Sequence, residues 1–316
     1  MNHNFIWLAV WLLTIGCNSK TETPSSYPSH FPASLSAPNN NPSTVLGVAL
    51  GRMLFHDPTL SPKGNVACSS CHIPSFHFGD TVSLSAGHQG ETTHRNTPPL
   101  LNMAWSPLLF WDGGGLNIES VSLTPLHNES EMGWKDLALL EQRLRASPSY
   151  RELFSQAFGT QNIEIAHVLR ALAQYQRSLI HAESRWDKWI LRQGELTKPE
   201  LEGWSLFQKQ CAGCHKPPLF TNYAFYKVSS DVLPDTLPLD HAARGRNRIT
   251  QKLADLGKYR TPTLRGLGKT YPYFHDGRFL TIEDLMQSPG FDNLHAGKPM
   301  TNQEKQLLIS FLNTLN

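Results

Sequence analysis

The sequence predicts an all-α protein in which long loops connect two helical units. Apolar side chains recur at helical spacing along residues 163–180. Two stretches, 197–200 and 301–304, have the Thr-x-x-Glu spacing of a capping box, which begins a helix. No sustained alternation of apolar and polar residues indicates a strand, and stretches such as 216–262, rich in Pro, Gly, Asp and Ser, are typical of loops.

Size and charge limit the kind of protein this is. The 316 residues suffice for about two domains with a buried core. The 28 Lys and Arg side chains nearly balance the 26 Asp and Glu side chains, which gives a net charge of +2 without runs of like charge. The sequence therefore offers no surface for nucleic acid or for an anionic membrane.

The N-terminus is predicted to be an export signal. Residues 5–15, FIWLAVWLLTI, form an apolar run too short to span a bilayer. The run ends in LTIGC, which resembles the lipobox of bacterial lipoproteins and implies a signal over residues 1–16 with lipidation of Cys17; simple secretion is the alternative. Residues 17–42, rich in Ser, Pro and Asn, predict a disordered tether, so the folded part begins near residue 43.

The other four cysteines form two copies of one motif. Cys68-Ser-Ser-Cys71-His72 and Cys211-Ala-Gly-Cys214-His215 both read C-x-x-C-H. In this motif two thiols one helical turn apart add to the vinyl groups of a haem, and the histidine ligates its iron. A zinc knuckle, a redox dithiol or a single four-cysteine zinc site are the alternatives. Because both pairs carry the histidine and the chain is exported, we expect two covalently bound haems c.

Several segments in a fixed order carry a family resemblance. The order is LGRMLFHDPTLSPKGNVACSSCH, HRNTPPLLNMAW, LLFWDGG, EMG, ELEGWSLFQKQCAGCH, RTPTLRGLGKTYPYFHDG and LISFL. It resembles the bacterial di-haem cytochrome c peroxidases and their MauG relatives, from about residue 45 to the end. The resemblance implies two cytochrome c-like domains, 43–165 with the haem that reacts with peroxide and 166–316 with the electron-transfer haem.

The resemblance also assigns two catalytic residues. Glu131, in Glu-Met-Gly, matches the acid over the peroxide site, and a carboxylate can move a proton between the two peroxide oxygens. Without the resemblance, Glu131 would be interpreted as a surface residue at a helix start. Trp111 matches a tryptophan between the two haems, where it can relay an electron; on sequence alone it would be interpreted as a core residue.

A calcium site is implied between the domains. Asn96, Thr270 and Pro272 match its ligands, one side-chain amide oxygen and two backbone carbonyls. Oxygen donors suit calcium, although so few protein ligands would need several waters. His275, in YFHDG, matches a family histidine near this loop and is assigned no chemistry.

His88 is predicted to be a removable ligand of the N-terminal haem iron. It lies sixteen residues beyond His72, where peroxidases of the family place such a distal histidine and MauG-type enzymes have none. A surface position is the alternative for His88, and His77 and His94 are the other histidines nearby. A six-coordinate iron must lose a ligand before it can bind peroxide, so this residue bears on the mechanism.

The distal ligand of the C-terminal haem departs from the family. The position that carries methionine in the peroxidases and tyrosine in MauG is Pro289, which cannot ligate iron. Met286, about one helical turn earlier, is the expected ligand, with His295 and Met300 as alternatives. Gly114 and Val121 also differ from residues that many peroxidases have near the peroxide site.

Three functions are therefore expected as alternatives. The first is a periplasmic peroxidase, anchored to the membrane only by its lipid, that reduces hydrogen peroxide with electrons from a small cytochrome c or cupredoxin by way of the C-terminal haem and Trp111. The second is a MauG-like enzyme that oxidises a residue, such as tryptophan, of a partner protein. The third is a non-enzymatic di-haem electron carrier. Family peroxidases are often dimers, but no stretch here identifies an interface.

Overall fold

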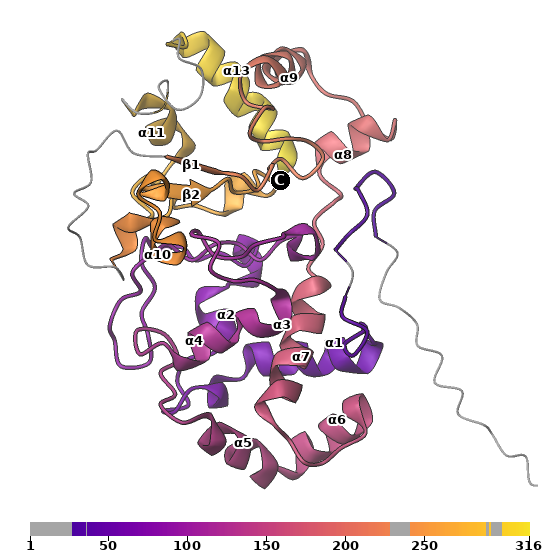
Figure 1. Cartoon of the computed structure of the whole chain (residues 1–316). Helices are drawn as coiled ribbons and strands as arrows, with labels where there is room; N and C mark the ends of the chain where they lie inside the picture. The colour runs from indigo at the N-terminus through magenta and orange to yellow at the C-terminus, as the bar shows by residue number, and fades with distance from the viewer. Residues whose placement is uncertain (1–26, 36, 228–240, 289–290, 292–298) are drawn as a thin grey trace, which may run out of the picture.

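The computed structural model describes residues 27–35, 37–227, 241–288, 291 and 299–316 (Figure 1). The predicted signal over 1–16, the lipidation site Cys17, the start of the predicted tether and His295 lie outside the described residues. Within the described ranges, no helix combines the length and the apolar character that crossing a membrane would require.

The first unit is a bundle of helices around one apolar core, in the lower half of Figure 1. Its two central helices, α1 and α7, cross at Gly51, where a β-carbon would lie 2.0 Å from the carbonyl oxygen of Ala171. Only glycine allows this approach of the two backbones. The helices of this unit are α1 Val45–His56, α2 Cys68–Cys71, α3 Ile118–Val121, α4 Leu123–His127, α5 Leu137–Ala146, α6 Pro148–Phe158 and α7 Ile165–Arg177.

The second unit, in the upper half of Figure 1, also has two helices that approach closely at a glycine, and it surrounds a separate core. Gly203 of α9 lies against α13, and a β-carbon on it would meet the carbonyl oxygen of Leu307 at 2.0 Å. In each unit, the helix that precedes the cysteine motif is thus packed closely on a helix later in the chain. The helices of this unit are α8 Arg185–Ile190, α9 Lys198–Gln210, α10 Asn247–Thr250, α11 Ile282–Gln287 and α13 Asn302–Leu312.

The described residues are rich in helix and contain little strand. The strands β1 Phe225–Lys227 and β2 Lys258–Arg260 form one antiparallel pair with Tyr226 opposite Tyr259. This pair falls in the stretch predicted to be loop, because three-residue strands are too short to show an alternating pattern. The short 3-10 helices are η1 Pro58–Leu60, η2 Pro74–Phe76, η3 Met103–Trp105, η4 Ala242–Arg244, η5 Leu253–Asp255, η6 Leu267–Lys269 and η7 Asn313–Leu315.

The predicted helix starts are confirmed. Thr197 is the N-cap of α9, and its backbone N–H donates to the Glu200 carboxylate at 2.7 Å. Thr301 caps α13 in the same way, with 2.8 Å from its N–H to Glu304. The helix predicted over 163–180 is α7. Local capping chemistry was therefore sufficient to place these elements.

The predicted domain boundary after residue 165 is wrong. Val168, Leu172 and Tyr175 of α7 are buried in the first core, not in the second. The first unit therefore continues through α7, and the chain passes to the second unit between Leu179, which still belongs to the first core, and Trp186, which belongs to the second. Helical periodicity showed that α7 has an apolar face but not which core that face contacts.

The described part of the predicted tether, from residue 27, is packed on the body of the protein. Phe31 is buried against Trp105, with ring centroids 5.1 Å apart. The Trp105 indole N–H donates to the carbonyl oxygen of Pro32 at 2.8 Å, and the Leu35 N–H donates to Ala104 at 2.9 Å. The prediction of disorder is wrong here because a few apolar and aromatic side chains in a polar segment suffice to attach it.

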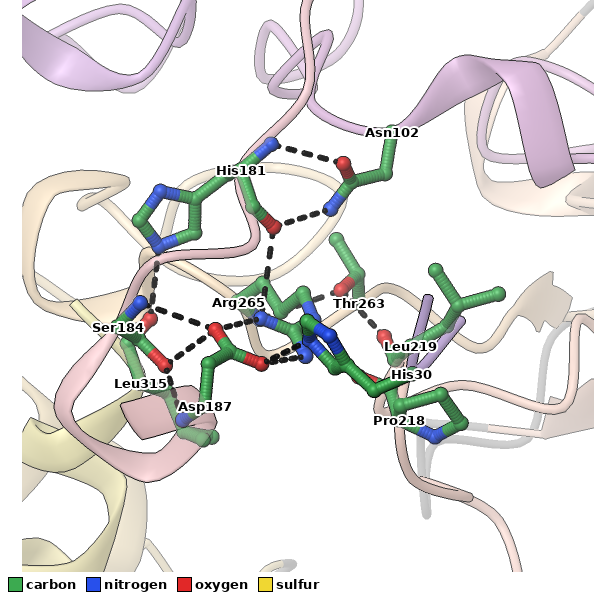
Figure 2. Close-up of polar contacts among 10 residues, drawn as sticks. All are labelled: His30, Asn102, His181, Ser184, Asp187, Pro218, Leu219, Thr263, Arg265 and Leu315. Carbon is green, nitrogen blue, oxygen red and sulfur yellow. Dashed lines mark hydrogen bonds and ion pairs between the residues drawn. The ribbon is translucent and has the colours of Figure 1, made fainter. Parts of the chain in front are cut away.

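A buried ion pair lies where the N-terminal segment and both units meet (Figure 2). The guanidinium of Arg265 donates to both carboxylate oxygens of Asp187, each at 2.7 Å, and both side chains are almost fully buried. Asp187 also accepts from Ser184 at 2.7 Å and contacts the His30 ring at 2.8 Å. Arg265 Nε donates to the carbonyl oxygen of Pro218 at 2.7 Å, three residues after the second C-x-x-C-H motif. The pair therefore holds the loop that follows His215.

Candidate functional site

The first cysteine motif opens onto a cavity of about 450 Å³. Cys68 and Cys71 are the ends of α2, so one helical turn places both thiols near the cavity, and His72 follows directly. Burial raises the pKa of Cys68 to about 12 and that of Cys71 to about 11, so both are thiols at neutral pH. The volume is in the range of cofactor pockets.

His72 is oriented as an iron ligand would be. Its Nδ1 lies 2.8 Å from the carbonyl oxygen of Phe78, which can only accept, so Nδ1 carries the proton and Nε2 carries the lone pair that can bind a metal. The chain turns back at His77 and Phe78, which both have left-handed backbone conformations. Burial lowers the pKa of His72, which favours the neutral ring that binds metal.

Glu131 lines the same cavity. Its Oε1 accepts a hydrogen bond of 2.6 Å from the Asn128 amide. Burial raises the pKa of the Glu131 carboxyl, and its charge acts on both thiols of the motif. The structure therefore brings together the predicted acid and the predicted iron ligand. A carboxyl group with a raised pKa can both accept and return a proton near neutral pH.

Residues of both units line the cavity, and Trp111 lies at the boundary between the two sets. Its indole N–H donates to the carbonyl oxygen of Asn96 at 2.8 Å, and its own carbonyl oxygen accepts from the backbone N–H of Arg260 in β2 at 2.8 Å. Its side chain lines the cavity, as do Tyr223 and Thr263 of the second unit. Trp111 therefore contacts both units, and its role in electron transfer stays a prediction.

His88 lies outside the lining of this cavity. Its buried ring packs against Gly133, where a β-carbon would lie 2.0 Å from Nε2. Nδ1 has no hydrogen-bond partner, and Nε2 lies 3.2 Å from the Gln89 amide nitrogen. His88 contacts the cavity lining through its backbone, because its N–H donates to the carbonyl oxygen of Glu131 at 2.7 Å. The ligand role of His88 stays a prediction.

The other two candidate histidines differ in position. His94 is exposed and lines the cavity. His77 packs against Gly266, with its ring centroid 4.8 Å from that of His181. His77 therefore belongs to the contact between the units rather than to the cavity.

The loops predicted to hold calcium lie side by side. A β-carbon on Gly79 would be 3.9 Å from the carbonyl oxygen of Thr97 and 4.0 Å from Cα of Thr270. The backbone N–H of Asn96 donates to the carbonyl oxygen of His275 at 2.8 Å, and its side-chain amide donates to carbonyl oxygens of the 82–83 turn. Pro272 is buried after a cis peptide bond. Calcium binding at Asn96, Thr270 and Pro272 stays a prediction.

His275 has a structural explanation. Its ring stacks on that of Tyr259, with centroids 3.7 Å apart and planes 15° apart. Burial lowers the pKa of His275 to about 4, so the ring is neutral. Its carbonyl oxygen accepts the Asn96 N–H, and the residue therefore attaches the segment after Pro272 to the Asn96 loop.

The second cysteine motif belongs to the second core. Cys211 ends α9 as its C-cap and is buried, so this motif lies in a turn rather than on a helix. His215 Nδ1 lies 3.3 Å from the carbonyl oxygen of Phe220, a longer version of the arrangement at His72. Met286 of α11 is buried in this core and lines a second cavity of about 210 Å³ against α13; Met300 is buried in the same core. The Met286 ligand role stays a prediction.

The four cysteines do not form one zinc site. Cys68 packs on the first core and Cys211 lies in the second. Within the part of the chain that the structure describes, no three His, Cys, Asp or Glu side chains gather in a metal-binding group. Among the residues that line the first cavity, Arg248 Nε and Gln176 Oε1 are buried without hydrogen-bond partners, which fits a further polar group in that cavity.

Sequence reasoning missed a cluster of charged residues on the cavity wall. Arg95, Arg248 and Arg260 line the cavity around Asp112. They come from three separate loops or short elements and have no fixed spacing along the chain. No sequence signal could have grouped them, because only the packing of the second unit on the first brings them together.

Comparisons with known proteins identify a family for this chain. The family profile of the di-haem cytochrome c peroxidases matches residues 46–195. The chain is 33% identical to the cytochrome c551 peroxidase of Nitrosomonas europaea over 84% of this chain and 78% of the relative. It is also 33% identical to the methylamine utilization protein MauG of Methylorubrum extorquens, over 90% of this chain and 82% of that protein.

Solved structures show the same fold. A crystal structure of a MauG-like protein associated with microbial copper homeostasis superposes with a TM-score of 0.82 at 29% identity, over 91% of this chain and 94% of the other. The diheme peroxidase BthA from Burkholderia thailandensis superposes with a TM-score of 0.73 at 22% identity, covering 89% of each chain. With two C-x-x-C-H motifs in separate cores and relatives of this similarity, the chain belongs to the di-haem cytochrome c peroxidase family, a family of peroxidase-like oxidoreductases that implies two c-type haems.

Proposed function

We propose that this protein is an exported peroxidase that reduces hydrogen peroxide to water, with two electrons from a small cytochrome c or cupredoxin and two protons. The observation that carries the proposal is one cavity lined by His72, Glu131 and Trp111. A haem attached through Cys68 and Cys71, with His72 on its iron, would supply the metal that binds peroxide and exchanges electrons.

Glu131 has the properties of the proton-transfer group. Cleavage of the O–O bond requires a group that takes a proton from one peroxide oxygen and delivers it to the departing oxygen. The Glu131 carboxyl can do both, because burial raises its pKa toward neutrality and the Asn128 amide fixes Oε1. Its position beside the motif thiols supports this role.

Trp111 supports an electron route between the units. Its backbone and side chain bond to residues of both units, and its ring lines the cavity. An aromatic side chain at this position shortens the gap between the second cysteine motif and the cavity. We therefore place Trp111 on the path from the C-terminal haem to the N-terminal haem.

His88 would act as a removable ligand of the N-terminal haem iron. The position of its ring against Gly133 would then be the released one. The buried ring has no partner at Nδ1, and an unmade buried hydrogen bond costs about 1–3 kcal/mol. The ring is held in this position by its packing on Gly133 and by the Gln89 contact at Nε2. Leaving this position would let Nε2 enter the cavity.

Removal of the His88 imidazole tests this gating. We expect ferric wild-type protein to react slowly with peroxide until it is half-reduced, and His88→Ala to react at once in the ferric state. His94→Ala, at an exposed histidine that lines the cavity, is the matched control and should behave as wild type. Stopped-flow absorbance measures the rate of the reaction with peroxide, and electron paramagnetic resonance measures the spin state of the ferric iron. High-spin ferric iron in resting wild type would contradict the ligand role.

A MauG-like oxidation of a partner protein is the second candidate. Gly114 and Val121, which differ from residues of many peroxidases, both line the cavity, and the chain is as similar to MauG as to a peroxidase. Mixing ferric protein with peroxide, with and without a reduced cytochrome, separates the two. Catalytic oxidation of the cytochrome supports the peroxidase. A persistent absorbance change without cytochrome turnover supports the partner oxidation.

The remaining parts of the proposal concern location and assembly. A lipid on Cys17 would anchor the protein in the periplasm, with no other membrane contact. Calcium at Asn96, Thr270 and Pro272 would join the two units, and Met286 would be the distal ligand of the C-terminal iron. Mass spectrometry of the mature N-terminus, metal analysis and the mass in solution, which would reveal a homodimer, test these points separately.

A further inference from the structure

The arginine cluster on the cavity wall lacks enough negative charge. Arg95 Nη1 donates to Asp112 Oδ2 at 2.7 Å, and Arg248 Nη1 reaches the same oxygen at 3.2 Å. Arg260 has no ion-pair partner among the described residues; its Nε donates to the carbonyl oxygen of Phe110 at 3.2 Å. Arg95 and Arg248 therefore share one carboxylate and Arg260 has none, so two of the three positive charges in the cluster remain uncompensated.

Two of these arginines also have hydrogen-bond donors without acceptors. Arg95 Nε and Arg248 Nε are buried and have no partner. An unsatisfied buried donor on a charged group is costly, so such groups normally meet an acceptor. Both residues line the cavity, where an acceptor can be placed. The other carboxyl group on the wall, that of Glu131, lies beside the motif thiols and accepts a hydrogen bond from the Asn128 amide.

The cavity has the chemistry of a site for a flat apolar molecule with an anionic edge. Phe55, Met103 and Leu109 contribute apolar lining. The thiols can attach one edge of such a molecule, and the guanidinium groups can bind carboxylates at another. Planar guanidinium groups bind carboxylates with two parallel hydrogen bonds. Two uncompensated positive charges match the two propionates of a haem.

We propose that Arg95, Arg248 and Arg260 bind the propionates of the N-terminal haem. Arg248 belongs to α10 and Arg260 to β2, so two of the three come from the second unit. The N-terminal haem is therefore held by both units. This inference rests on the haem that the proposed function places in the cavity but not on reactivity toward peroxide.

The charge of Arg248 sets the expected effect on the reduction potential. A guanidinium beside a propionate offsets its negative charge and makes it easier to add an electron to the iron. We expect Arg248→Gln to lower the midpoint potential of the N-terminal haem by about 59 mV, equivalent to a tenfold shift toward the ferric form. The C-terminal haem should keep its potential, and Arg248→Lys should recover part of the shift.

Spectroelectrochemical titration of the intact di-haem protein measures both potentials, and the propionate bending band of the resonance Raman spectrum reports the contact. Arg143→Gln is the matched control, since Arg143 binds backbone carbonyl oxygens of the 59–62 turn outside the cavity lining. Its potentials should equal those of wild type. Failure of haem attachment in Arg248→Gln with recovery in Arg248→Lys would also support the proposal.

Two results would overturn the inference. One is an unchanged N-terminal potential and propionate band in Arg248→Gln. The other is a wild-type potential that moves with added acetate, which would assign the arginines to a free anion. A protein that shows the potential shift but does not reduce peroxide would overturn the proposed function alone, so the two failures are distinguishable.

Discussion

Glu131→Gln is expected to lower the rate of peroxide reduction by about 10²–10⁴-fold, the usual contribution of a general acid–base group. Glutamine keeps the shape of the side chain and an oxygen near Asn128, but it cannot take up or return a proton. Both haems should remain attached, because Glu131 lines the cavity without forming part of either motif. Steady-state oxidation of a reduced cytochrome donor by peroxide measures the rate.

The raised pKa of Glu131 adds a pH signature. Its carboxyl stays protonated to higher pH than an ordinary glutamate, so the acid side of the pH–rate profile should lie above about 4.3, the ordinary value. This limb should disappear in Glu131→Gln. Glu129→Gln, two residues away on the exposed surface, is the matched control and should keep the wild-type profile. A wild-type rate in Glu131→Gln would remove Glu131 from the mechanism.

Arg265→Met is expected to lower the free energy of unfolding by about 3–5 kcal/mol, because it leaves the Asp187 carboxylate buried without its cation. The midpoint temperature of unfolding should fall by roughly 6–20 °C for a unit of this size. Thermal unfolding followed by circular dichroism measures the change. Since Arg265 also binds the Pro218 carbonyl oxygen, the absorption of the C-terminal haem should broaden before global unfolding.

Arg185→Gln gives the matched control for this loss. Arg185 pairs with Glu200, but its side chain is 53% exposed. An exposed pair contributes about 1 kcal/mol or less. Equal destabilisation by Arg265→Met and Arg185→Gln would show that the buried pair is not a main support of the junction.

The pH dependence of stability follows from Asp187. Burial opposes ionisation of this carboxyl, but the Arg265 guanidinium and the Ser184 donors outweigh it, and the pKa of Asp187 is lowered. A lowered pKa contributes stability that is present above the ordinary aspartate value of about 3.9 and is lost as pH falls below it. The wild-type protein should lose this part of its stability in acid, and Arg265→Met should lose less.

Local chemistry explains which parts of the fold could be predicted. The capping boxes at Thr197 and Thr301 and the apolar face of α7 depend on neighbouring residues, and the structure confirms them. The attachment of α7 to the first core and of Phe31 to Trp105 depends on contacts between distant segments. Composition and periodicity do not contain that information, so the boundary and the tether were wrongly predicted.

The candidate site also combines features that the sequence predicts with features that depend on contacts between distant segments. The C-x-x-C-H motifs could be recognised from the sequence, because covalent attachment of a haem requires that spacing of two cysteines and a histidine. Glu131 and Trp111 were assigned through the family resemblance, and the structure brings both to the cavity with His72. Arg248 and Arg260 line the cavity only because the second unit packs on the first. The orientation of the His88 ring depends on its contact with Gly133, which the sequence does not reveal.

The electron balance of the reaction is the most direct test of the proposed activity. Purified protein, half-reduced first, is mixed with a known amount of hydrogen peroxide and an excess of reduced cytochrome c, and the oxidised cytochrome is counted. Reduction of peroxide to water predicts two cytochromes oxidised for each peroxide consumed, over many turnovers. Peroxide that persists, or that disappears without oxidation of the cytochrome, would contradict the peroxidase.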